Sequence, residues 1–200
     1  MLAAAQSAGS RPRVISIAVD GVIHPVTVEI VAHALEQAQS QQASAILIEL
    51  STPGGLVDAT RDLIKHITAS PIPVITYVTP SGAHAASAGF FLLEAGNVAA
   101  MAPHTNTGAA SPVVMGQQMD PVMRAKVEND LSALMRSLTV PRGRNADLAE
   151  KAIREAKAWS DQEALDGHLI DLIAGDEPPD RVLQCSINIA KDQLEAIKYC

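Results

Sequence analysis

Apolar residues follow two alternating patterns along most of the chain. Short, almost wholly apolar or alternating runs are typical of strands, and they occur at 13–20, 44–50, 73–78, 97–102, 105–110 and 169–173. Segments in which apolar residues recur every three or four positions predict helices at 25–41, 56–68, 88–93, 121–140 and 146–156. Because strands and helices alternate, we expect an α/β domain with a mainly parallel sheet.

The stretch around Ser87 interrupts this regular alternation. The strand expected at 73–78 runs into a turn of small residues, and Ser87 stands where that turn should become the next helix. Small neighbours leave room for a substrate backbone, and the start of a helix offers unpaired N–H groups. A nucleophilic serine needs both features. The alternative is that Ser87 is an ordinary N-cap whose hydroxyl closes the helix end.

A second turn with chemical potential follows the strand at 44–50. It reads Ser51-Thr52-Pro53-Gly54-Gly55, in which two glycines allow positive φ angles and close approach of the backbone to a ligand. Its N–H groups could point into a cleft. The alternative is a common strand–helix connection without a binding role.

A nucleophilic serine requires a base, and both histidines and lysines are candidates. Lys126 is the only lysine between Ser87 and Lys151. Its position at the edge of the apolar stripe of the helix at 121–140 permits partial burial, which favours an uncharged amine. Alternatively, Lys126 forms an ion pair with Asp130 one turn away and remains charged. The histidine candidates are His24, His33, His66, His84, His104 and His168.

Composition limits the remaining possibilities. Apolar residues make up 48% and aromatic residues only 2% of the chain, so the core must consist of small and aliphatic side chains. The net charge of −7, with scattered basic residues, argues against a nucleic-acid-binding face. The two cysteines, Cys185 and Cys200, indicate neither a disulfide scaffold nor a zinc site, and their pairing stays open. No apolar run reaches the roughly 18 residues of a membrane span.

Five motifs in fixed order suggest a family. They are 51–55 (Ser-Thr-Pro-Gly-Gly), 85–89 (Ala-Ala-Ser-Ala-Gly), 101–103 (Met-Ala-Pro), 143–145 (Gly-Arg-Asn) and 163–165 (Glu-Ala-Leu). Together they resemble the Clp-class membrane-bound serine proteases of the NfeD type, in the Clp/crotonase superfamily, with the signal peptide peptidase A enzymes as relatives. An α/β-hydrolase is disfavoured, because Ala85 replaces the first glycine of G-x-S-x-G.

The resemblance implies a fold, a domain division and catalytic residues. The fold would be a Clp/crotonase-like spiral of β-β-α units at 13–175, after a flexible N-terminus or signal-peptide remnant at 1–12 and before a polar linker and tail at 176–200. Ser87 would be the nucleophile and Lys126 the base of a Ser-Lys dyad. The N–H groups of Gly55 and Ala88 would form the oxyanion hole.

The resemblance also indicates where a substrate lies. An extended segment would bind between Gly54 and a mobile loop at 111–121, which begins with Ser111 and Pro112 and lies where a lid could be. In soluble Clp peptidases, the catalytic histidine occupies the position of Ser111. Its absence here favours a lysine base, and activity is then expected to rise with pH as the amine loses its proton.

The family further implies partners and location. The substrate would be an apolar polypeptide, with stomatin-like proteins as the expected partner, and no metal or cofactor is required. A homo-oligomer is expected. The full-length parent would be anchored by membrane spans absent here and would carry the protease domain outside the cytoplasm, this chain being soluble. Two alternatives stay open: a non-catalytic peptide-binding scaffold, and a crotonase-like acyl-CoA enzyme with the same fold.

Overall fold

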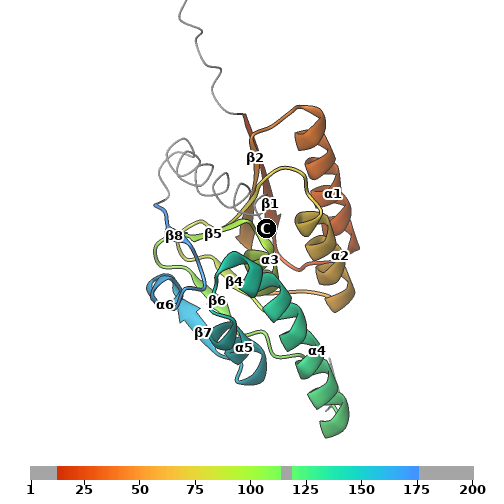
Figure 1. Ribbon diagram of the computed structural model, residues 1–200, viewed down its shortest axis with the longest axis vertical. Helices are drawn as coiled ribbons and strands as arrows, with labels where there is room; N and C mark the ends of the chain where they lie inside the picture. The colour runs from red at the N-terminus through yellow and green to blue at the C-terminus, as the bar shows by residue number, and fades with distance from the viewer. Residues whose placement is uncertain (1–12, 114–118, 176–200) are drawn as a thin grey trace, which may run out of the picture.

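The computed structural model describes residues 13–113 and 119–175 and shows a five-stranded parallel sheet as its centre (Figure 1). The strand order is β1-β2-β3-β5-β8, and every neighbouring pair is parallel. The strands are β1 (Val14–Asp20), β2 (Ala45–Ser51), β3 (Val74–Val78), β5 (Val98–Met101) and β8 (Leu172–Ile173).

A second, smaller sheet lies beside the carboxyl ends of these strands. It consists of β4 (His84–Ala86), β6 (Asn106–Gly108) and β7 (Ala158–Ser160), with β4 parallel and β7 antiparallel to the central β6. A bridge between Thr52 and Ala85 joins it to the end of β2. The chain thus passes from a strand of the large sheet to one of the small sheet and then into a helix, as β3, β4 and α3 show. This β-β-α succession is the expected Clp-like architecture.

Helices cover the sheets and carry the residues that matter below. They are α1 (Pro25–Ser40), α2 (Val57–Thr68), α3 (Ala88–Ala95), α4 (Pro121–Thr139), η1 (Val140–Arg142), α5 (Ala146–Arg154) and α6 (Asp161–Asp166). Figure 1 shows α1 and α2 side by side along the large sheet, whereas the first half of α4 extends away from both sheets.

Most of the elements expected from the sequence are confirmed. The five strands expected at 13–20, 44–50, 73–78, 97–102 and 105–110 all form. The turn expected before Ser87 is wrong in part, because residues 84–86 form β4. Three small or polar residues show no apolar alternation, so this strand depends on its partner β6 rather than on its own pattern.

The core has two parts, one on each face of the large sheet. The larger part packs β1, β2 and β3 against the helices and includes Leu63, Phe90 and Met135, all fully buried. The smaller part holds the alternate strand positions, such as Leu47 and Ile75. No helix within residues 13–113 and 119–175 has both the length and the apolar character that crossing a membrane requires.

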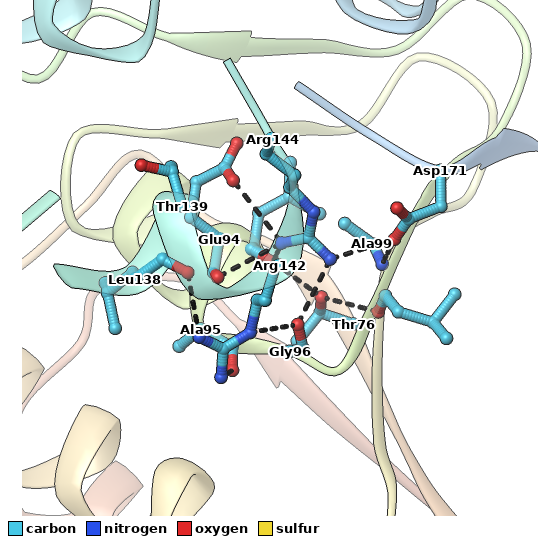
Figure 2. A network of polar contacts seen from close by, with 12 residues as sticks. Thr76, Glu94, Ala95, Gly96, Ala99, Leu138, Thr139, Arg142, Arg144 and Asp171 are labelled. Carbon is cyan, nitrogen blue, oxygen red and sulfur yellow. Dashed lines mark hydrogen bonds and ion pairs between the residues drawn. The ribbon is translucent and has the colours of Figure 1, made fainter. Parts of the chain in front are cut away.

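A buried ion cluster joins the end of α3 to the turn that follows α4. The Arg144 guanidinium lies 3.3 Å from a Glu94 carboxylate oxygen and 2.8 Å from one of Asp171 (Figure 2). Glu94 is fully buried, and burial raises the pKa of its carboxyl to about 7 although Arg144 opposes the shift. Glu94 therefore holds its proton more tightly in the folded chain than in the unfolded one.

Replacing Glu94 by glutamine should change how stability depends on pH. In the wild type, Glu94 makes the free energy of unfolding fall as the pH rises from 4.5 to about 7, because only the unfolded chain loses this proton there. The Glu94→Gln variant has no proton to lose at this position. Its free energy of unfolding relative to wild type should therefore increase between pH 4.5 and about 7. Urea unfolding at several pH values measures this difference in stability, with Glu155→Gln, an exposed residue at the end of α5, as the control. Parallel curves for Glu94→Gln and wild type would contradict the prediction.

Candidate active site

Ser87 lies at the N-terminus of α3 in an unusual backbone conformation. Its φ is 54° and its ψ is −115°, a region that residues with a Cβ avoid, at a cost of about 1–3 kcal/mol. Hydrogen bonds on both sides hold it there: Ser87 N donates to Gly108 O at 2.8 Å, and Phe90 N donates to Ser87 O at 3.1 Å. The side chain makes no capping hydrogen bond, so the interpretation of Ser87 as an N-cap hydroxyl is wrong.

The glycine turn after β2 packs directly on Ser87. A Cβ built on Gly54 would lie 2.8 Å from Ser87 Cβ and 3.1 Å from Ser87 Oγ, and Gly54 has a φ of 120°. Only glycine fits this position, both for space and for conformation. The two turns that the sequence singled out thus form one site.

Gly55 is fixed by the backbone of Ile23, which precedes α1. Ile23 N donates to Gly54 O at 2.9 Å and Ile23 O accepts from Leu56 N at 3.0 Å, so Ile23 holds the turn from both sides of Gly55. A Cβ on Gly55 would lie 2.2 Å from Ile23 O, which excludes any other residue. The Gly55 and Ala88 N–H groups find no acceptor among the described residues, and both residues line the same cleft as Ser87.

The cleft beside Ser87 is mainly apolar. It lies between α2, α3 and α4 and continues to the segment after β6. Its apolar lining includes Val57, Phe91, Pro112, Val113, Leu131 and Leu134. Thr60 and Arg61 of α2 supply polar groups in this lining. A cleft of this kind accepts an apolar side chain next to the serine hydroxyl.

Ser111 and Pro112 line this cleft, as their expected role in substrate binding requires. The Ser111 hydroxyl donates to the carbonyl oxygen of Ile153 in α5, and this bond fixes the first residue of the loop. Residues 114–118 of the loop lie outside the described residues. No histidine occurs among the described residues that line the cleft.

Lys126 lies on α4 but outside the lining of the cleft. It is five residues before Leu131, which corresponds to about 7.5 Å along the helix axis. The expected partial burial is wrong for this state of the protein: Lys126 is exposed, because the first turns of α4 extend beyond the elements that cover its second half (Figure 1). The expected ion pair with Asp130 is also wrong, since Asp130 pairs with Arg61 of α2.

Several residues of the cleft were not singled out from the sequence. Arg61, Phe91 and Leu134 are examples. Leu134 belongs to the apolar stripe of the helix expected at 121–140, which the periodicity alone assigns to the core. The pattern recognises that a helix face is apolar, but it cannot tell whether another helix or a ligand covers that face.

Comparison with known proteins identifies a family for this chain. The family model described as NfeD1b, N-terminal domain, matches residues 13–179. The membrane-bound protease PH1510 of Pyrococcus horikoshii is 40% identical over 141 residues, which are 70% of this chain and 32% of that protein. The membrane protein NfeD1b of Bacillus subtilis is 37% identical over 86 residues, which are 43% of this chain and 19% of that protein. The chain therefore spans about a third or less of these relatives' length.

Solved structures of one of these proteases are also similar to this chain. A serine-to-alanine mutant of the 1510-N membrane-bound stomatin-specific protease superposes with a TM-score of 0.80 at 34% identity, covering 86% of this chain and 84% of that one. A lysine-to-alanine mutant of 1510-N in complex with a substrate peptide gives a TM-score of 0.78 at 34% identity, covering 84% and 78%. The structures studied thus include variants of a serine and of a lysine.

Proposed function

The chain belongs to the NfeD1b N-terminal domain family, and on that premise we propose that it is a serine endopeptidase with Ser87 as nucleophile and Lys126 as general base. The observation that carries the proposal is the Ser87 hydroxyl on a strained turn that lines an apolar cleft together with Gly55 and Ala88, whose N–H groups have no acceptor in the part of the chain that the structure describes. In the 1510-N structures, the altered serine precedes the altered lysine at a separation similar to that between Ser87 and Lys126. We propose residues 13–175 as the protease domain.

The reaction would proceed through an acyl-enzyme. The uncharged Lys126 amine takes the hydroxyl proton of Ser87 as Ser87 Oγ attacks the scissile carbonyl. The N–H groups of Gly55 and Ala88 bind the resulting oxyanion, and each such donor contributes roughly 2.7–4 kcal/mol in other acyl-transfer enzymes. The protonated amine then donates its proton to the leaving nitrogen, and water hydrolyses the ester.

Substrate binding would change the surroundings of Lys126 so that its amine can act as a base. A polypeptide in the cleft would lie against the first turns of α4 and shield them from water. Loss of water favours the uncharged form of an amine, which a general base requires. Catalytic hydrogen bonds that are long without substrate commonly tighten in the complex, so the exposure of Lys126 in the substrate-free chain is compatible with the assignment.

We propose an apolar segment of a stomatin-like protein as the substrate. The apolar lining of the cleft supports the chemical class, and the name of the 1510-N relative supports the protein class. Since the relatives are membrane proteins, we propose that this domain works at a membrane, on the side outside the cytoplasm. A homo-oligomer would be its working form.

Covalent labelling tests this function. A fluorophosphonate should add one phosphonyl group at Ser87, detected by mass spectrometry of the peptide that contains it, and the protein should cleave an apolar peptide. A binding scaffold would hold the peptide without cleavage or labelling. A crotonase-like enzyme would turn over an acyl-CoA thioester and leave Ser87 unlabelled. Either of these last results would overturn the proposal.

A further inference from the structure

The helix that begins after Ser87 has a buried C-terminus without a cap of its own. All eight residues of α3 are buried, and Gly96 after it is extended rather than left-handed. The last carbonyls of a helix have no partner within it, so buried ones need donors from elsewhere. In α3, the groups that donate to these carbonyls hold the C-terminal end of the helix, which lies opposite Ser87.

Two arginines from the turn after α4 supply them (Figure 2). Arg142 Nη2 donates to Ala95 O at 2.7 Å and Arg142 Nε to Gly96 O at 2.9 Å. Arg144 Nη1 donates to Glu94 O and Arg144 Nη2 to Gly96 O, both at 3.1 Å. Two cations thus meet the negative end of the α3 dipole. Burial lowers the pKa of Arg142 to about 10, so it stays charged at neutral pH.

Arg142 also binds the end of α4 itself. Its Nη1 donates to Leu138 O at 2.8 Å, so one guanidinium joins the last turns of α3 and α4. Farther along, Ala88 and Phe91 of α3 share the cleft with Leu131 and Leu134 of α4. The two helices therefore run side by side in the same direction.

This arrangement links the two proposed catalytic residues. Ser87 immediately precedes α3, and Lys126 lies in the first half of α4. A displacement of α3 along α4 would move the Ser87 hydroxyl relative to Lys126 by the same amount. The contacts at the far ends of both helices resist such a displacement.

We infer that Arg142 is a positioning residue for the peptidase reaction, fixing α3 along α4 so that Ser87 and Lys126 stay in register; this inference rests on the proposed function. Arg142 acts through Ser87 and touches no substrate. Arg144 shares the anchoring, but its removal would leave the carboxylates of Glu94 and Asp171 buried without their cation, so Arg142 is the better residue for a test.

The test compares Arg142→Met with Arg136→Met. Arg136 lies on α4, before the turn that carries Arg142, and forms an ion pair with Glu150 of α5, so this control also loses an arginine and one of its ion pairs. At a temperature where both variants are fully folded, Arg142→Met should lower kcat and the rate of fluorophosphonate labelling at least tenfold, with KM unchanged. Arg136→Met should keep wild-type rates, and Arg142→Lys should recover part of the loss by retaining a cation.

A second readout does not depend on activity. Amide hydrogen exchange in 88–95 should become faster in Arg142→Met than in Arg136→Met, because α3 loses donors at its end. Wild-type kcat in folded Arg142→Met, or unchanged exchange in α3, would overturn the positioning role. If the wild type is labelled and Ser87→Ala is not, either of these outcomes would overturn only the positioning role of Arg142 and would leave the proposed peptidase function in place. A wild type that neither cleaves nor labels would instead overturn the proposed function and, with it, the positioning role.

Discussion

Replacing Ser87 by glycine should abolish peptidase activity and at the same time stabilise the protein by about 1 kcal/mol. A φ of 54° with a ψ of −115° is strained for serine but readily adopted by glycine. Relief of about 1–3 kcal/mol of strain should exceed the roughly 0.5–1 kcal/mol that glycine costs through the greater freedom of the unfolded chain. Urea unfolding and peptide cleavage measure the two effects.

The matched control is Ser87→Ala. It also removes the nucleophile, so activity should fall by about 10⁴-fold or more, as in other serine proteases without their serine. Alanine keeps a Cβ and therefore keeps the strain, so Ser87→Gly should be more stable than Ser87→Ala. Residual turnover above about 1% in either variant would contradict the nucleophilic role of Ser87. Equal stability of the two would show that the turn stores no strain.

Replacing Lys126 by alanine should remove peptidase activity with almost no change in stability. A general base in a dyad commonly accounts for about 10³-fold or more of the rate. Because Lys126 is exposed, its loss should change the free energy of unfolding by less than about 0.5 kcal/mol. Peptide cleavage, fluorophosphonate labelling and urea unfolding of the variant measure these effects.

Lys151→Ala provides the control, since Lys151 is an exposed lysine on α5 away from the cleft. It should retain wild-type activity. Wild-type activity should increase with pH as the amine that acts as base loses its proton. Full activity in Lys126→Ala, or a pH profile that reports only an imidazole-like group near about pH 6.5, would exclude Lys126 as the base.

The sequence predicted the parts of the site that depend on local rules. A strand followed by Pro53, Gly54 and Gly55 indicates a tight turn, and the structure shows why both glycines are needed. Small residues around Ser87 were expected to leave room for a substrate backbone, and the structure adds a packing reason for one of them: a Cβ on Gly89 would lie too close to Thr52 Cγ2. Such constraints act within a few residues and leave a direct trace in the choice of side chain.

Contacts between segments far apart in the chain could not be predicted from the sequence. The Arg61–Asp130 pair joins α2 to α4, and the Arg142 contacts join the end of α3 to the end of α4. Neither produces a periodic pattern. Burial of Lys126 was expected because periodicity defines the faces of a helix, but whether another element covers a face depends on the fold.

The way in which Ile23 holds the glycine turn affects which changes in the gene the protein can accept. These contacts use main-chain N–H and C=O groups, so they depend on the position of residue 23 in the chain, whereas its buried side chain packs separately in the core. An insertion or deletion between β1 and α1 would instead move a different peptide unit beside Gly55. Surface connections usually vary in length among homologous chains, but this one should keep its length even where its residue types diverge.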